Sequence, residues 1–266
     1  MQQPITSIKT QGYRQRQFAA ALLTQHSSKP SVTNQANPIR VVCISDTHNH
    51  QSELPPGDIL LHAGDLTESG SFDEVQAGLK WLSSQPHPFK ILIAGNHDVL
   101  LDEAFLQRYP ERRYGLSQTK QDLDWGTVTH LEDTHITLDV PVQDPPPYGQ
   151  THRKVTIYGS PWTPQYTLSA FQYPASTAPL HWSDRLDPAP VPTPDIIVTH
   201  GPPKLYLDQR GVHQAGCPYL LAEIAQIRPR LHVFGHIHAA HGREDVVLDA
   251  VRRVHDDVQL GRMMAR

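Results

Sequence analysis

The chain of 266 residues is predicted to adopt an α/β fold, and three features of the sequence support this prediction. Short apolar runs that are bounded by glycine or polar residues are typical of buried parallel strands. Segments with apolar residues at helical spacing separate several of these runs. Between residues 127 and 162 the pattern changes to an alternation of apolar and polar residues, which is typical of half-exposed antiparallel strands.

The central strand is expected within Ile91–Val99 (ILIAGNHDV), a continuous apolar run that stops at a glycine. Asn96, His97 and Asp98 follow in consecutive positions. In open α/β sheets, functional groups lie just beyond the carboxyl ends of such strands. Asn96 offers a carbonyl oxygen to a metal, His97 can donate a proton, and Asp98 could hold the imidazole of His97 in one tautomer. A strand followed by an ordinary polar turn is the alternative, and this segment alone does not decide between the two.

The other elements follow from similar patterns. Buried strands are expected at 39–45, 59–63, 195–199 and 231–234, and alternating antiparallel strands at 128–132, 135–140 and 154–159. Apolar residues at helical spacing predict helices at 72–82, 100–109, 217–227 and 244–260. A proline-rich loop is expected at 144–149. Residues 174–194 are also rich in proline, so we expect a long irregular excursion that forms a wall of the substrate pocket.

The domain organisation follows from the ends of the chain. Residues 1–38 show no periodicity, and five basic residues precede the first acidic residue, Asp46. We interpret this segment as a disordered tail, and a mitochondrial transit peptide is the alternative because such peptides are basic and poor in acidic residues. Residues 39–241 are expected to form one domain, and residues 242–266 to supply a helix that packs on it.

Composition limits the compartment and the partners. Cys43 and Cys217 are too few for a disulfide framework, and Cys43 lies in an apolar run as a small buried hydrophobe. We therefore expect a reducing, cytoplasmic location. The net charge of −4 offers no general attraction to long nucleic acids or to acidic membranes. No run of about 18 apolar residues is present that could span a membrane, and the sequence does not indicate an oligomeric state.

Five apolar runs end in side chains that can hold a metal ion. In chain order these are Asp46 and His48; Asp65; Asn96, His97 and Asp98; His200; and His236 and His238. Residues i and i+2 of a strand point to the same side, so a DxH or HxH pair can converge on one place. Aspartate, histidine and asparagine without a thiolate suit manganese, iron, zinc or magnesium. One such pair is a weak signal, but five strand ends with ligand-type residues predict a metal site.

These residues form motifs that are similar to those of the calcineurin-like metallophosphoesterase superfamily, and the similarity covers about residues 39–240. The motifs are DTH (46–48), GD (64–65), GNHD (95–98), VTHG (198–201) and GHIH (235–238). The segments YGSPWTP (158–164) and VTHGPPK (198–204) more closely resemble the branch of mammalian brain and fetal metallophosphoesterase-domain proteins, which itself resembles class III cyclic nucleotide phosphodiesterases. The resemblance implies a four-layer αββα sandwich, in which two mixed β-sheets face each other with helices outside each.

The same resemblance implies a role for each residue. One metal ion would be held by Asp46, His48, Asp65 and His238. The other would be held by Asp65, Asn96, His200 and His236, so that Asp65 bridges the two ions. His97 would lie beside the leaving-group oxygen as a general acid, oriented by Asp98, which stands where glutamate is frequent in such proteins.

We therefore expect a hydrolase of phosphoric esters that depends on a dinuclear metal centre and uses a metal-bridging hydroxide. Two cations about 3.5–4 Å apart lower the pKa of a bridging water and neutralise the phosphoryl oxygens. Manganese is the expected metal, with iron, zinc and magnesium as alternatives. The expected substrate is a small phosphodiester, with a cyclic nucleotide as one candidate. A phosphomonoesterase or phosphoprotein phosphatase, and a nucleotide-binding scaffold of low activity with the same fold, stay open as alternatives.

Several other residues are not assigned to the metal site. Histidines outside the motifs are expected to be surface or half-buried residues: His50, His62, His130, His135, His152, His232, His241 and His255. His213 lies in a glycine-rich loop that could face the pocket. Trp162 and Trp182 could stack on a nucleobase, although a position in the core or at the rim is favoured.

Overall fold

The computed structural model describes residues 38–113, 117–142, 151–186 and 193–263. The chain divides into two units. The main unit runs from residue 35 to 242, and the described part of the second unit is residues 243–263. Apart from Pro38, the tail expected at 1–38 lies outside the described residues, as does the loop expected at 144–149.

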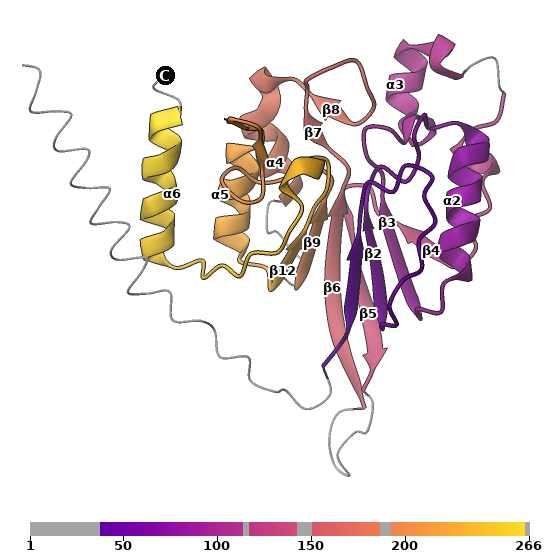
Figure 1. Ribbon diagram of the computed structural model, residues 1–266, viewed down its shortest axis with the longest axis horizontal. Coiled ribbons are helices and arrows are strands. Elements are labelled where there is room, and N and C mark those ends of the chain that lie inside the picture. Colours follow the sequence, from indigo (N-terminus) through magenta and orange to yellow (C-terminus); the bar gives the residue numbers. More distant parts are fainter. Residues whose placement is uncertain (1–37, 114–116, 143–150, 187–192, 264–266) are drawn as a thin grey trace, which may run out of the picture. The chain divides into compact units, whose positions relative to one another are not determined.

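Two four-stranded sheets form the centre of the main unit (Figure 1). The first sheet has the order β1–β2–β3–β4, and its strands are Val41–Ile44, Ile59–Ala63, Phe89–Ile93 and Val128–His130. The second has the order β12–β9–β6–β5, and its strands are Leu231–Val233, Ile196–Thr199, His152–Ser160 and Thr134–Pro141. The first sheet is parallel throughout its described strands, whereas the second is mixed because β5 and β6 pair antiparallel.

The alternation of side chains along the buried strands divides the apolar residues between two cores. On β2, Ile59 and Leu61 face the second sheet and share a cluster with Val198 of β9. Leu60 points to the opposite side and shares a cluster with Leu79 of helix α2. One core therefore lies between the two sheets, and another lies between the first sheet and its helices.

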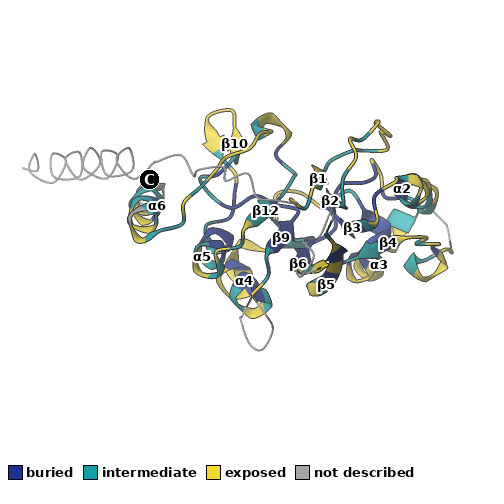
Figure 2. Cartoon of the chain, turned by 90° about the horizontal axis from the view of Figure 1, so that it is seen from below, coloured by how far each residue is buried: buried dark blue, intermediate teal, exposed yellow. Residues whose placement is uncertain are grey.

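Helices flank the pair of sheets on both outer sides (Figure 1). α2 (Phe72–Ser84) and α3 (Glu103–Arg108) lie beside the first sheet, and α4 (Ala178–Leu186) and α5 (Pro218–Ile227) lie beside the second. Central strands are buried, whereas the outer sides of the helices are exposed (Figure 2). The predicted arrangement of two sheets flanked by helices is confirmed, but only the second sheet is mixed as expected, since the described strands of the first are all parallel. No helix among the described residues is long and apolar enough to cross a membrane.

Hydrogen bonds to side chains set where two of these helices begin. At α2, Ser71 accepts a bond from the Glu74 amide and the Glu74 carboxylate accepts one from the Ser71 amide, which is a capping box. Asp102 caps α3 by accepting a bond from the Phe105 amide. The single helix expected over 100–109 is therefore wrong, because Asp102 divides it into a 3-10 turn (η1, Val99–Leu101) and α3.

Shorter elements complete the main unit. Two small strand pairs were not expected from the sequence: parallel β7 (Thr163–Pro164) and β8 (Gln172–Tyr173), and antiparallel β10 (Gln209–Arg210) and β11 (His213–Gln214). Further 3-10 turns are η2 (Pro110–Arg113), η3 (Lys120–Asp122), η4 (Ala175–Thr177) and η5 (His238–Ala240).

The structure corrects three further expectations about the main unit. β4 pairs parallel with β3 rather than antiparallel, because the intervening helical turns return the chain to the edge of the first sheet in the same direction. Helix α4 lies inside the region that was expected to be irregular, with Pro179 in its first turn, where proline is tolerated. Cys43 is exposed rather than buried, because β1 is an edge strand among the described strands.

The second unit contains α6 (Ala250–Met263). The helix was expected to begin at Glu244, but residues 244–249 are not helical. Its first turn is held by Asp249, whose side chain accepts a bond from the Arg252 amide. That this helix packs on the main unit stays a prediction.

Candidate metal centre

Ligand-type side chains converge at the carboxyl ends of β1, β2, β3, β9 and β12, which belong to both sheets. Three groups have potential ligand atoms within 4.8 Å of one another. They are Asp46, His48 and His238; His48, Asp65 and His97; and Asp65, His200 and His236. Because His48 and Asp65 each belong to two groups, the three groups form one continuous centre.

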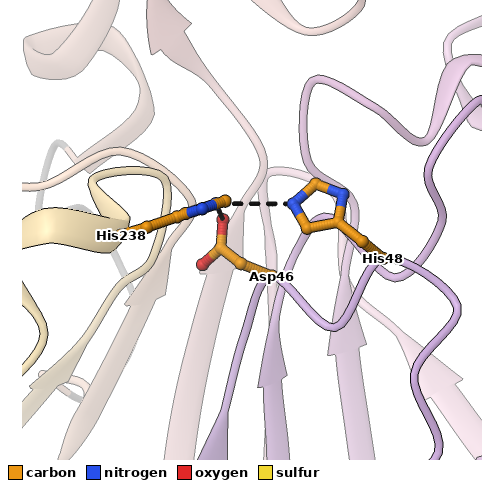
Figure 3. A group of neighbouring side chains, drawn as sticks. All are labelled: Asp46, His48 and His238. Atoms are coloured by element: carbon orange, nitrogen blue, oxygen red, sulfur yellow. Dashed lines mark hydrogen bonds and ion pairs between the residues drawn. The ribbon is translucent and has the colours of Figure 1, made fainter.

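The first group combines a carboxylate with two imidazoles (Figure 3). Nε2 of His238 lies 3.3 Å from Oδ1 of Asp46 and 3.4 Å from Nε2 of His48. His48 and His238 approach Asp46 from opposite sides in Figure 3. Both oxygens of Asp46 also accept the amide N–H of His236, at 2.9 and 3.0 Å, so the strand ends of the two sheets are joined here.

The second and third groups share Asp65, which is 2% exposed. Oδ2 of Asp65 lies 3.3 Å from Nε2 of His200 and 3.9 Å from Nε2 of His48. Oδ1 of Asn96 lies 3.1 Å from Nε2 of His200, which brings Asn96 beside the third group. Asp65 thus lies between the side chains that were predicted to bind two different ions.

Backbone carbonyls fix the orientation of two of the imidazoles. Nδ1 of His48 lies 3.2 Å from the carbonyl oxygen of Thr67, and Nδ1 of His200 lies 2.8 Å from that of Ala63. A ring that donates from Nδ1 presents the lone pair of Nε2, which is the common arrangement for histidines that bind a metal. In both residues Nε2 is the atom that faces the other ligand-type groups.

The electrostatics of the buried pair Asp65–His200 suit a cation. Burial disfavours ionisation of Asp65, but the charge of His200 and a hydrogen bond from it outweigh burial and hold the pKa of Asp65 below its usual range. Burial also lowers the pKa of His200, yet the charge of Asp65 more than compensates and raises it to about 9. A proton on His200 thus balances the negative charge of the buried Asp65 carboxylate, and a bound divalent ion would take the place of that proton. Carboxylate, amide and imidazole donors without thiolates fit such an ion.

Unusual backbone geometry directs the ligand-type side chains. Asp46, His48, Asp65 and His236 have φ angles of 53°, 44°, 54° and 72°. Residues other than glycine rarely adopt this left-handed region, and such strain is concentrated at functional sites. A side chain at Gly235 would collide with the carboxylate of Asp46, so only glycine permits this close approach.

The prediction that Asp98 orients His97 is not what the structure shows. Asp98 is fully buried, and its carboxylate accepts four hydrogen bonds, from the amides of Leu66, Thr67 and Gly95 and from the hydroxyl of Thr67. Consecutive residues in this tight turn point in different directions, so Asp98 holds the turn rather than the imidazole of His97.

His97 is oriented by a different group. Its Nδ1 lies 2.6 Å from the carbonyl oxygen of Glu68, which fixes the orientation of the ring. Its ring lies edge-on to that of His48, with 4.7 Å between the centroids. Its amide donates to Oδ1 of Asp65 at 2.8 Å, so His97 is tied to the centre through its backbone as well.

Sequence reasoning missed two residues that lie beside this centre. The ring of Tyr166 lies 5.1 Å from that of His236, and the hydroxyl of Ser169 donates to the carbonyl oxygen of Asn96 at 2.5 Å. Both belong to the connection between β7 and β8, and no motif marks either. Only the contact between distant segments reveals them.

The residues outside the motifs have different positions. His62 is fully buried, not at the surface, and its Nε2 lies 2.9 Å from the Thr47 hydroxyl. His213 is exposed on β11. Trp182 is fully buried in the core, and Trp162 is half-buried with its indole donating to Asp133, so neither presents a free ring to a nucleobase.

The structure is a sandwich of two sheets flanked by helices, and aspartates, histidines and an asparagine gather at the strand ends of both sheets. This combination is typical of the class of metal-dependent phosphoesterases. The chain belongs to the calcineurin-like phosphoesterase family, whose model matches residues 39–240. The predicted family is therefore confirmed. The family implies hydrolysis of phosphoesters with divalent metal ions.

Three curated relatives illustrate this membership. The chain is 41% identical over 227 residues to probable rhamnogalacturonate lyase C of Emericella nidulans, a match that covers 85% of this chain and 19% of that protein. It is 37% identical over 209 residues to human metallophosphoesterase domain-containing protein 1, with 76% and 61% covered. It is 32% identical over 217 residues to UPF0046 protein K07C11.7 of Caenorhabditis elegans, with 77% and 65% covered. The chain thus spans less than two thirds of the length of each.

The fold is also found in a solved crystal structure that is 11% identical to this chain. The two superpose with a TM-score of 0.51, and the match covers 79% of this chain and 87% of that one. At this identity the similarity supports the fold alone.

Proposed function

We propose that this protein is a phosphodiesterase that hydrolyses small phosphodiesters with two divalent cations, manganese being the expected metal. The observation that carries the proposal is the position of Asp65, whose carboxylate lies between His48 and His200 and is shared by two groups of ligand-type residues. A single carboxylate in this position can serve two ions at once.

The ligands proposed for the two ions are those of the family motifs. One ion would be held by Asp46, His48, Asp65 and His238, and the other by Asp65, Asn96, His200 and His236. When bound, the two cations would supply Lewis-acid charge to the phosphoryl oxygens and lower the pKa of a water. The protein's own contribution is to fix the donors, through the carbonyls of Thr67 and Ala63 and through the left-handed strand ends.

His97 is proposed to donate a proton to the departing alcohol. Its Nδ1 is bonded to the Glu68 carbonyl, so Nε2 is the nitrogen that would carry and release the proton. General acid catalysis of this kind typically contributes roughly 10²–10⁴-fold to the rate. Asp98 would act only indirectly, by holding the turn that carries His97.

The preference for a diester is supported by the similarity of YGSPWTP (158–164) and VTHGPPK (198–204) to the metallophosphoesterase-domain branch, to which the human relative belongs by name. A cyclic nucleotide is one candidate within this class. The net charge of −4 does not favour long nucleic acids. We further propose that the main unit acts in the cytoplasm.

The test is hydrolysis of bis(p-nitrophenyl) phosphate with added manganese, together with the metal content of the purified protein. Asp65→Asn should lose both ions and turnover, because the amide carries no charge and offers only one oxygen. Asp73→Asn is the control, since Asp73 is an exposed carboxylate on α2. Normal metal content in Asp65→Asn would refute the bridging role. Turnover of p-nitrophenyl phosphate alone would favour a monoesterase, and bound metal without any turnover would favour a scaffold.

A further inference from the structure

The connection between β7 and β8, residues 165–171, is held firmly beside the metal centre. The Gln165 amide donates to the carbonyl of Tyr173, and the Phe171 amide donates to Oδ2 of Asp102 at 2.7 Å. In its middle, the hydroxyl of Ser169 donates to the carbonyl of Asn96 at 2.5 Å. The connection is therefore tied at both ends and to one of the proposed metal ligands.

Tyr166 is the side chain of this connection that reaches over the centre. Its ring lies 5.1 Å from that of His236 at an interplanar angle of 63°, a favourable edge contact between aromatic rings. Burial and the charge of Asp65 raise the pKa of the Tyr166 phenol, while interactions with Thr167, Arg210 and Asn96 oppose this. The contact with His236 places the ring of Tyr166 beside the centre.

Tyr166 is nevertheless 48% exposed, so part of its ring is open to a ligand. Exposed large apolar side chains are few in the described part of the main unit: Tyr166, Leu168, Leu180 and Val212. Two of them belong to this connection, and a third, Val212, lies at the tip of the β10–β11 hairpin, next to Arg210. β10 packs against η5, which begins with His238, so the hairpin borders the centre as well. Of these four side chains, Tyr166 is the one whose ring contacts a residue of the centre, so its exposed part offers an aromatic surface beside the ligand-type groups.

We propose that Tyr166 is a substrate-specificity residue whose ring stacks on a planar substituent of the phosphodiester, the one that stays on phosphorus after hydrolysis. The retained side is assigned because Tyr166 contacts His236, whereas His97, the proposed donor to the departing alcohol, contacts His48. This inference rests on the proposed function and narrows the substrate class to diesters with an aryl or nucleobase group on the retained side. A monoester has no such group to place there.

The test compares two diesters with the same leaving group and the same charge. Bis(p-nitrophenyl) phosphate retains an aryl group on phosphorus, whereas ethyl p-nitrophenyl phosphate retains an ethyl group. The ratio of their kcat/KM values is measured for each variant relative to the unaltered protein, so that the intrinsic difference in reactivity cancels. A stacked aromatic pair should contribute about a two- to tenfold preference for the aryl ester.

Tyr166→Ala should lower this ratio by that factor, through a higher KM for the aryl ester, because the ethyl ester has no ring that could lose a stacking partner. Tyr166→Phe should keep the ratio because the ring remains. Both variants should retain their metal content. Leu180→Ala is the control, since Leu180 is also a large exposed side chain (68%) but belongs to α4.

Three results would overturn the inference. An unchanged ratio in Tyr166→Ala would show that the ring does not contact the retained group. Equal losses on both diesters in Tyr166→Phe would assign the role to the hydroxyl instead. Loss of metal in Tyr166→Ala would show that the ring only positions His236. In each of these cases the unaltered protein still hydrolyses both diesters. If the proposed function is wrong, the unaltered protein itself hydrolyses neither.

Discussion

Replacement of Asp102 should destabilise the main unit, because this buried carboxylate connects two elements. One oxygen accepts the Phe105 amide at 2.9 Å and caps α3, and the other accepts the Phe171 amide at 2.7 Å and holds the connection that carries Tyr166. Loss of a helix cap costs about 1 kcal/mol, and a buried amide left without a partner costs about 1–3 kcal/mol. Asp102→Ala should therefore lower the free energy of unfolding by about 2–4 kcal/mol.

Asp102→Asn separates the two contributions. Asparagine is also a good cap, so its oxygen can still accept from Phe105 while its amide group faces the N–H of Phe171. This variant should lose about 1–3 kcal/mol, which is the share of the second bond alone.

The assay is urea unfolding followed by tryptophan fluorescence, after metal has been removed with a chelator. Asp73→Asn serves as the control because substitutions of exposed residues usually change stability by less than about 0.5 kcal/mol. If both Asp102 variants unfolded at the same urea concentration as the unaltered protein, the reasoning from these two hydrogen bonds would be refuted.

Two further predictions concern histidines. His97→Ala should keep its metal content but lose roughly 10²–10⁴-fold in turnover, and the loss should be largest for poor leaving groups. The measurement is the rate of hydrolysis of a series of aryl phosphodiesters by this variant and by the unaltered protein. The same loss for every leaving group would show that His97 does not transfer the proton. Burial lowers the pKa of His232 from 6.5 to about 3, so the stability that its neutral form contributes is complete above pH 6.5 and is lost as the pH falls toward 3. Within that range the free energy of unfolding should fall by about 1.4 kcal/mol per pH unit on account of this group. His232→Asn should show a correspondingly shallower decline in urea unfolding between pH 7 and pH 5, and an identical decline would contradict the assignment.

The buried strands could be predicted closely from the sequence. β2 has the predicted bounds, 59–63, because both of its faces are covered and its run ILLHA, which is apolar except for His62, lies between Asp58 and Gly64. The direction of β4 could not be predicted, since alternation indicates which face is buried but not how the chain returns to the sheet. Helix α4 was missed because proline density was taken to exclude helices, although Pro179 lies in a first turn that needs no N–H.

Some features of the candidate site could also be predicted from the sequence, and others could not. Its ligand-type residues were predictable because each directly follows an apolar run, and the motif order was informative as a whole. The partner of His97 was not predictable, because the ring nitrogen bonds to the backbone carbonyl of Glu68, and every residue has such a carbonyl. Tyr166 could not be found either, since its contact with His236 joins segments about 70 residues apart that only the folded chain brings together.

The ligand-type residues come from both sheets, and this affects how long the chain stays folded. Asp46, Asp65 and Asn96 follow strands of the first sheet, whereas His200 and His236 follow strands of the second. Ions bound by these residues would link the two sheets, and they would bind only to the folded chain, in which the residues lie together. A ligand at 100 times its dissociation constant stabilises the folded state by about 2.7 kcal/mol. The supply of divalent cations would therefore govern not only turnover but also how often the two sheets part and expose their shared core to proteases and to aggregation.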